Sequence, residues 1–242
     1  MAGLVLGGYQ CKIDSLVQSW SVITGLGRPD RQEQSLASIY KHLVRPQDKV
    51  ICLLTSPFVN SVPSPGYIQG YPAGLRENGG QYTHAAAWVV MAHAVAGMGS
   101  RAFELFQIVN PINHTKDTAG ALRYQTEPYV TCGDVYSVPP HAGRGGWSWY
   151  TGSSGWLYRV AWEHILGLKI RGDKFAVEPC IPSAWKEFNM KVSLRGTTFN
   201  IKVLNPTNVE RGVQSVQLEG QELPSKEIPF SAGQGNVVVI MG

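Results

Sequence analysis

The 242-residue sequence contains little cysteine, and its four cysteines are far apart. Cys11, Cys52, Cys132 and Cys180 have neither the close spacing of metal ligands nor the framework of a disulfide-stabilised secreted domain. We therefore predict four reduced thiols in a reducing compartment and no metal site.

The sequence also lacks long apolar runs and clustered positive charge. No run of about 18 apolar residues occurs, so no segment is expected to span a membrane. The first ten residues lack the basic region and cleavage site of a signal peptide. The basic residues behind the net charge of +4 are scattered, which excludes the basic face that nucleic acid requires. These absences favour a globular domain in the cytoplasm.

Helical patterns dominate up to about residue 170. Apolar residues recur there at helical spacing, and start or stop residues flank several of the segments. The predicted helices cover residues 13–26, the segment after Pro29, and residues 81–98, 101–109 and 152–167. The segment 81–98 is apolar on nearly all sides and should be buried. Residues 55–73 and 111–146 are long irregular segments, and loops of such length in compact proteins are usually functional.

The pattern changes after Gly167 to short alternating segments separated by glycine, proline and asparagine. The predicted strands cover residues 175–178, 189–194, 198–204, 213–218 and 237–240. We therefore predict a mainly α-helical lobe followed by a C-terminal β-sandwich. Paired helices joined by long loops are typical of an α/α toroid, although the helices here are too few to close such a ring.

One stretch, residues 139–156, combines three tryptophans with several glycines and with polar residues of several kinds. Aromatic faces stack on the C–H surfaces of sugars, and glycine allows backbone N–H groups to approach oxygen atoms closely. The alternative is a glycine-rich loop with aromatic residues in the core. A second stretch of similar character, residues 70–88, favours a site for a polar, ring-shaped ligand.

Four sequence blocks together carry a family resemblance. They are residues 13–25 (IDSLVQSWSVITG), 66–88 (GYIQGYPAGLRENGGQYTHAAAW), 127–156 (from EPYV to YTGSSGW) and 165–185 (ILGLKIRGDKFAVEPCIPSAW). In order and spacing they resemble the C-terminal part of family ninety-four glycoside phosphorylases, and most of all the phosphorylase-like domain of cyclic β-1,2-glucan synthases. The resemblance implies an (α/α)6 barrel followed by a jelly-roll-like β-domain.

On this resemblance the chain is a fragment of a longer protein. Residues 1–10 do not match the family, residues 11–170 correspond to the C-terminal portion of the catalytic barrel, and residues 171–242 correspond to the β-sandwich lobe. The parent would be a bacterial inner-membrane protein with this domain on its cytoplasmic side. Helices 13–26 and 81–98 would lack their neighbours in the barrel, so we expect their apolar flanks to drive self-association of the isolated chain.

The implied reaction is inverting phosphorolysis of a β-linked, β-1,2 glucan oligosaccharide or polysaccharide to α-glucose 1-phosphate. Inorganic phosphate is the co-substrate, no other cofactor is expected, and the anionic phosphate needs no general base. The resemblance puts the general-acid aspartate upstream, in a segment resembling tryptophan-asparagine-aspartate-glycine that this sequence lacks. We therefore expect no catalytic residue and no turnover in the isolated chain. A non-catalytic carbohydrate-binding lobe is the alternative.

The predicted phosphate site consists of His84, Thr151 and Gly152. The resemblance matches His84, in YTHAAAW, to a phosphate-binding histidine, which can donate a charge-assisted hydrogen bond. Thr151 and Gly152 match a threonine–glycine phosphate contact and open the helix 152–167, where free N–H groups favour an anion. The alternatives are a histidine satisfied inside a helix and an ordinary N-cap.

The predicted sugar site centres on Glu77, which the resemblance puts in the acceptor region, although it would also suit a surface loop. The other predicted sugar-binding residues are Arg76, Gln81, Tyr82, Glu127, Asp134, Arg144 and Trp149. Glu127 and Asp134 would alternatively brace their loop or form the acid/base pair of an inverting hydrolase, in which one of them would act with Glu77. Arg144 would contact phosphate or a sugar, or it would equally hold the glycine-rich loop in place. The tryptophans of residues 139–156 would either stack on a sugar or pack in the core, and Trp156 is the clearest core candidate. Asp14, Gln18 and Trp20 belong to a matching block, but their roles are not assigned.

Overall fold

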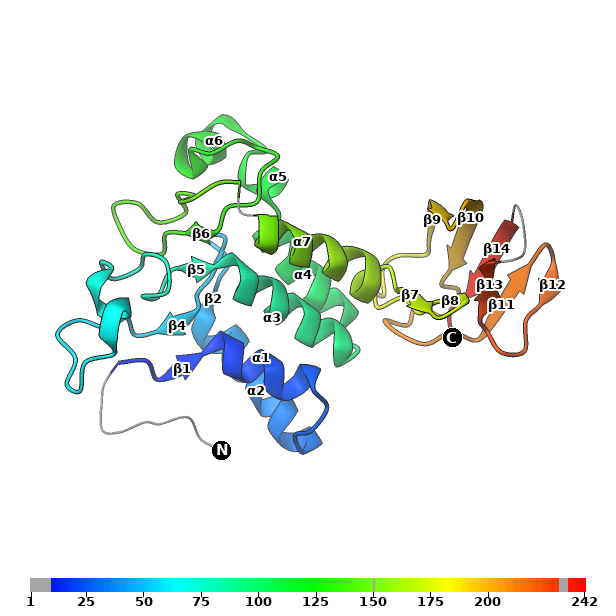
Figure 1. The fold of residues 1–242 in the computed structure, drawn as a ribbon, viewed down its shortest axis with the longest axis horizontal. Coiled ribbons are helices and arrows are strands. Elements are labelled where there is room, and N and C mark those ends of the chain that lie inside the picture. Colours follow the sequence, from blue (N-terminus) through cyan, green and yellow to red (C-terminus); the bar gives the residue numbers. More distant parts are fainter. Residues whose placement is uncertain (1–9, 150, 231–234) are drawn as a thin grey trace. The chain divides into compact units, whose positions relative to one another are not determined.

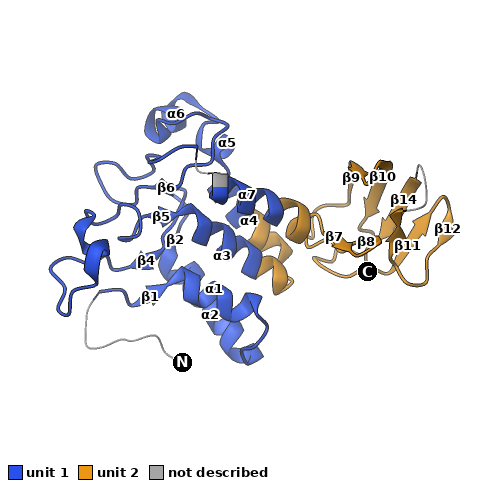
Figure 2. Cartoon of the chain, viewed as in Figure 1, with its two compact units in different colours: residues 1–92, 104–160 blue, residues 93–103, 161–242 orange. Residues whose placement is uncertain are grey.

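The computed structural model describes residues 10–149, 151–230 and 235–242, which form two compact units. Unit 1 comprises residues 1–92 and 104–160, and unit 2 comprises residues 93–103 and 161–242 (Figure 2). The last segment of unit 1 ends at residue 160, whereas the boundary predicted between the two lobes lies between residues 170 and 171, ten residues later and inside a strand.

The helices up to residue 165 follow the predicted order (Figure 1). They are α1 (Ser15–Ile23), α2 (Pro29–Leu43), α3 (Thr83–Val95), α4 (Gly99–Val109), α5 (Pro111–His114), α6 (Thr118–Tyr124), α7 (Thr151–Arg159) and the π-helical η2 (Val160–Ile165). Their ends follow local chemistry, since the Asp14 carboxylate accepts hydrogen bonds from two N–H groups of the first turn of α1. Pro29 opens α2, where its missing N–H costs nothing. No helix of the described residues is long and apolar enough to cross a membrane.

The burial of these helices confirms part of the expected pattern. Helix α2 buries Leu36, Ile39 and Leu43, and every side chain of α3 is buried or half-buried. Helix α1 instead leaves Leu16 and Val17 37% and 51% exposed. The exposed apolar flank that we expected is thus present on α1, whereas the expectation was wrong for α3, which neighbouring elements cover.

Short ladders of two residues tie the loops of unit 1 together. They pair β1 (Ile13–Asp14) with β4 (Leu54–Thr55), β2 (Val44–Arg45) with β3 (Val50–Ile51), and β5 (Gln81–Tyr82) with β6 (Asp134–Val135). The long segment 55–73 contains only one short 3-10 helix, η1 (Gly66–Gly70), after the end of β4. The β5–β6 ladder matters most, because it joins the start of α3 to the loop that leads towards α7.

The described residues of unit 2 form two sheets with the orders β12-β11-β14-β10-β9 and β13-β8-β7. The strands are β7 (Leu168–Arg171), β8 (Lys174–Val177), β9 (Glu187–Leu194), β10 (Thr197–Leu204), β11 (Ser215–Leu218), β12 (Gln221–Glu222), β13 (Ile228–Pro229) and β14 (Gly235–Ile240). Only the β10–β14 pair is parallel among these strands. The sheets touch through Phe175 and Phe199, which are fully buried with ring centroids 4.8 Å apart. The predicted β-domain and its five strands are confirmed, while β7, β12 and β13 were not predicted.

Candidate phosphate and sugar site

Helix α7 begins against the imidazole of His84, near the start of α3. A Cβ atom added to Gly152 would lie 2.8 Å from His84 Cε1 and 3.2 Å from Nε2. No larger residue fits without displacing the ring, so the glycine permits this approach. The structure therefore brings together two of the three predicted phosphate residues. The third, Thr151, supplies the first backbone position of α7, and its side chain lies outside the described part.

The His84 ring is held by aromatic neighbours rather than by hydrogen bonds. Tyr82 stacks on it with centroids 5.9 Å apart, and Trp88 lies at 5.7 Å on the next turn of α3. No described residue forms a hydrogen bond with either ring nitrogen. Burial lowers the pKa of His84 below its usual value, because desolvation penalises the imidazolium form. A half-buried histidine whose nitrogens are unused can donate to a ligand at the start of α7.

Trp88 extends this aromatic cluster to two further helices. Its ring meets Trp20 of α1 at 5.4 Å and Trp156 of α7 at 5.5 Å, both edge to face. Such pairs are worth about 0.5–1.5 kcal/mol beyond their buried area. Trp156 is half-buried in these contacts, as expected for a core residue, and Trp20 now has a packing role.

Asp134 joins the two glycine-rich stretches. Its side chain is only 2% exposed, and its carboxylate oxygens accept hydrogen bonds from the Arg76 and Trp147 backbone N–H groups, both at 3.2 Å. A Cβ atom on Gly146 would lie 2.2 Å from Asp134 Oδ1, so this approach also requires glycine. Burial raises the pKa of Asp134, although these N–H groups and the Arg76 charge act in the opposite direction. Its contacts match the loop-bracing alternative and leave little of the side chain for a sugar.

Arg76 and Glu77 lie beside this junction. The Arg76 guanidinium is stacked 4.2 Å from the centre of the Trp147 ring and 5.7 Å from that of Tyr71. Glu77 Oε2 is buried and accepts no hydrogen bond from the described residues. A buried carboxylate oxygen without a donor is unusual, and a ligand hydroxyl would satisfy it.

Trp149 and Glu127 form a second, more open pair. The Trp149 indole N–H donates to Glu127 Oε1 at 3.1 Å, while 68% of the tryptophan side chain remains exposed. Hydrogen bonds from the Glu127 backbone N–H and from Trp149 lower the pKa of the Glu127 carboxyl. Arg144 is exposed on the same loop, and its side chain forms no hydrogen bond or ion pair with the described residues. The Arg144 side chain thus does not pin the loop through the described residues.

Gln81 is buried and bound to another segment, which does not favour the sugar contact predicted for it. It is 1% exposed, and its side-chain oxygen accepts a hydrogen bond from Ile51 N–H at 3.0 Å. The sequence reasoning also missed Asn78, whose fully buried amide binds the backbone of Phe58 and Tyr71. Asn78 therefore fixes the loop that carries Glu77. In the sequence, only the position of Asn78 directly after Glu77 indicated that it could be important for the site.

Comparison with known families identifies the superfamily to which the chain belongs. Residues 5–167 match the catalytic domain of the glycosyl hydrolase 94 superfamily, and residues 168–220 match the C-terminal domain of glycosyl hydrolase family 65. The chain belongs to the glycosyl hydrolase 94 superfamily. The match begins at residue 5, within the segment 1–10 for which we expected no counterpart.

Individual relatives come from two functional groups. The chain is 44% identical over 207 residues to the cyclic beta-(1,2)-glucan synthase NdvB of Rhizobium meliloti (strain 1021), which covers 86% of this chain and 7% of the synthase. It is 30% identical to the N,N'-diacetylchitobiose phosphorylase of Vibrio furnissii over 92% of this chain and 27% of that enzyme. It is also 30% identical to the solabiose phosphorylase of Paenibacillus borealis, over 88% of this chain and 27% of that enzyme. The chain thus spans roughly a quarter or less of the length of these relatives.

Proposed function

We propose that this chain carries the phosphate pocket and part of the sugar site of an inverting glycoside phosphorylase that acts on β-1,2-linked glucan. The observation that carries the proposal is the contact between Gly152 at the start of α7 and the unbonded imidazole of His84. Phosphorylases among the relatives support the reaction, and the synthase at 44% identity supports the linkage. The two family matches support an (α/α)6 barrel of which the helices would form part, with a jelly-roll-like β-domain after it.

The residues would act by holding reactants. The phosphate would lie at the start of α7, where the helix dipole favours a negative charge. His84 adds one N–H donor when neutral and a positive charge when protonated. Glu77 would accept from a sugar hydroxyl through Oε2, the oxygen that no described residue satisfies. Phosphate then attacks the anomeric carbon, and the acid that protonates the leaving oxygen comes from outside these residues.

Asp134 and Glu127 give little support to a hydrolase. General acid/base catalysis needs a carboxyl group within reach of the substrate or its attacking water. Asp134 is almost completely buried with both oxygens occupied by backbone N–H groups. Glu127 is held by Trp149, and its lowered pKa disfavours the protonated form that a general acid requires.

Calorimetric titration of the purified chain with phosphate and with β-1,2-linked glucan oligosaccharides tests the proposal. We expect binding of both ligands, and we expect His84→Ala to weaken phosphate binding while leaving glucan binding within about twofold. Glucan binding without phosphate binding at His84 would identify a non-catalytic carbohydrate-binding lobe. Release of reducing sugar without phosphate would identify a hydrolase. Either result would overturn the proposal.

A further inference from the structure

A cavity lies within unit 2, formed entirely by residues of that unit. Its volume is about 510 Å³, within the range of roughly 300–1,000 Å³ that small-molecule sites occupy. Three cationic side chains line it, from β7, from the segment before β11 and from the segment before β13: Lys169, Arg211 and Lys226. His164 lines it too, and Glu178 is the only carboxylate among its lining residues in the described part of the chain.

Two of the three cations are fixed by backbone carbonyl groups rather than by carboxylates. Arg211 Nη1 donates to Val95 O at 3.0 Å, and Lys226 Nζ donates to Val213 O at 2.7 Å. Neither cation, nor Lys169, forms an ion pair with any described carboxylate. Since guanidinium has five N–H donors and ammonium three, most of these donors remain available to a ligand.

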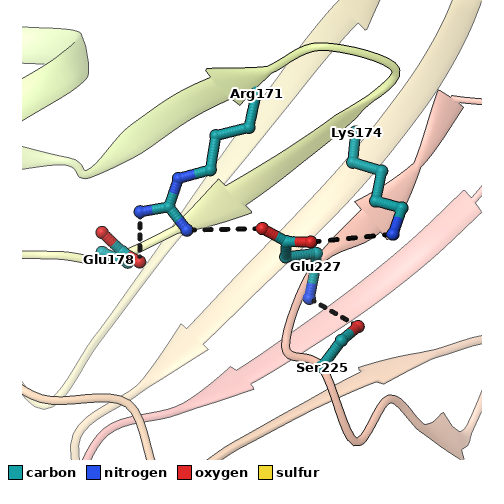
Figure 3. A network of polar contacts seen from close by, with 5 residues as sticks. All are labelled: Arg171, Lys174, Glu178, Ser225 and Glu227. Atoms are coloured by element: carbon teal, nitrogen blue, oxygen red, sulfur yellow. Dashed lines mark hydrogen bonds and ion pairs between the residues drawn. The ribbon is translucent and has the colours of Figure 1, made fainter.

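Acidic groups nearby already have partners. Glu178 accepts from Arg171 at 2.9 Å, and Glu227 is bound by Arg171 at 3.5 Å and by Lys174 at 3.7 Å (Figure 3). Glu210, the residue before Arg211, accepts a hydrogen bond from the Ser100 hydroxyl. The carboxylates of Figure 3 therefore contribute less negative charge to the cavity than their number suggests.

Backbone geometry holds Arg211 and Cys180 of the cavity in place. Gly97 has a φ of +82°, and a Cβ atom there would lie 3.3 Å from Arg211 Cδ, so the arginine packs against bare backbone. The backbone of Arg211 also pairs with that of Cys180, which lines the same cavity. Burial lowers the pKa of Lys169, although Glu163 and Glu178 raise it. Such a half-buried ammonium gains from a fixed anion beside it.

We propose that this cavity binds the phosphate group of a small phosphorylated molecule, independently of the pocket at His84. Fixed cations with unused donors suit a tetrahedral oxyanion that accepts several hydrogen bonds at once. The volume leaves room for the organic part of the molecule beyond the phosphate group. Inorganic phosphate and a sugar phosphate share the recognised group, and a titration with each separates them.

The test uses the complete chain with His84→Ala, so that the first pocket contributes little. Calorimetry with glucose 1-phosphate, with phosphate and with glucose should give binding for the first two and none for glucose, and tighter binding of glucose 1-phosphate than of phosphate. Adding Lys169→Met should weaken glucose 1-phosphate at least about tenfold, the size of one lost charge-assisted hydrogen bond. Lys191→Met, an exposed lysine on β9, removes the same charge and should leave the affinity unchanged.

A second variant guards against misfolding. Lys226→Gln keeps a donor for the Val213 carbonyl but removes the charge, so it should weaken binding while the far-ultraviolet circular dichroism is preserved. Absence of phosphate-group binding in the His84→Ala chain would overturn the proposal. So would equal affinities for Lys169→Met and Lys191→Met, or equal binding of glucose. Equal affinities for phosphate and glucose 1-phosphate would contradict recognition of a phosphorylated molecule rather than of phosphate itself.

Discussion

His84 shows how a single side chain is prepared for an anion without being charged in advance. Its ring is oriented by Tyr82 and Trp88, its nitrogens are unused by the described residues, and burial lowers its pKa. An anion at Gly152 would reverse this shift, because it favours the imidazolium form. Proton uptake and anion binding should therefore be linked at this residue.

Sulfate is the best probe of that linkage, since its own charge does not change near neutral pH. As the pH falls from 7.5 to 5.5 we expect sulfate to bind more tightly, by up to about tenfold per pH unit between the free and bound pKa values of His84. His84→Gln should bind sulfate more weakly, with no such slope. Calorimetry at several pH values measures both. An identical slope in His84→Gln would assign the proton to another group.

His114 should govern part of the acid sensitivity of unit 1. It stacks on Tyr124 at 4.6 Å, its Nε2 lies 2.8 Å from Ile108 O, and burial lowers its pKa to about 4. The folded state therefore favours the neutral form, so this stability is complete above about pH 6.5 and is lost as the pH falls towards 4. The expected loss is about 3 kcal/mol.

Urea unfolding at pH 7 and pH 4.5 measures this loss. His114→Gln keeps an N–H donor for the Ile108 carbonyl but cannot titrate, so its free energy of unfolding should fall clearly less than that of the original chain. Equal losses in the two proteins would show that other groups dominate the acid response.

At the scale of elements, the start of α7 depends on glycine at one of two nearby positions. A Cβ atom on Gly152 would collide with His84, whereas one on Gly155 would meet nothing within 4 Å. Gly152→Ala should weaken phosphate binding at least about tenfold, because the ring or the helix start must move. The matched control, Gly155→Ala, should keep the affinity and stabilise the helix by about 0.5–1 kcal/mol. Equal phosphate affinities in the two variants would contradict a site at this contact.

The elements that sequence predicted are those with a long periodic pattern. Helix α3, apolar on nearly all sides, and the alternating strands β9 and β10 were found because burial repeats along many residues. The two-residue strands β1, β2, β5 and β6 were missed, as were the short helices α5 and α6, because distant contacts rather than local pattern form them.

The residues of the candidate site could be predicted from the sequence, but the role of each residue could not. Motifs indicated both His84 and Gly152, yet the contact between them depends on the folding of α7 onto α3. Asp134 and Gln81 are polar residues in ligand-like motifs, but the structure uses their side chains to hold backbone N–H groups of other segments. Only burial distinguishes such a brace from a ligand contact.

At the scale of the whole molecule, we expect binding without turnover. The 242 residues contain no tryptophan-asparagine-aspartate-glycine segment, and general acid catalysis typically contributes about 10²–10⁴-fold. Incubation of the chain with β-1,2-glucan and phosphate, followed by an assay for glucose 1-phosphate, should detect no significant product. Turnover near about 1 s⁻¹, in the ordinary enzyme range, would show that an acid lies within this sequence.

The central claim is that phosphate binds between His84 and the first turn of α7. A crystal structure of the chain grown or soaked with phosphate tests it directly. We predict an anion about 3 Å from His84 Nε2 and from the first N–H groups of α7, which is hydrogen-bonding distance. A structure with phosphate bound elsewhere and this position filled only by water would contradict the claim.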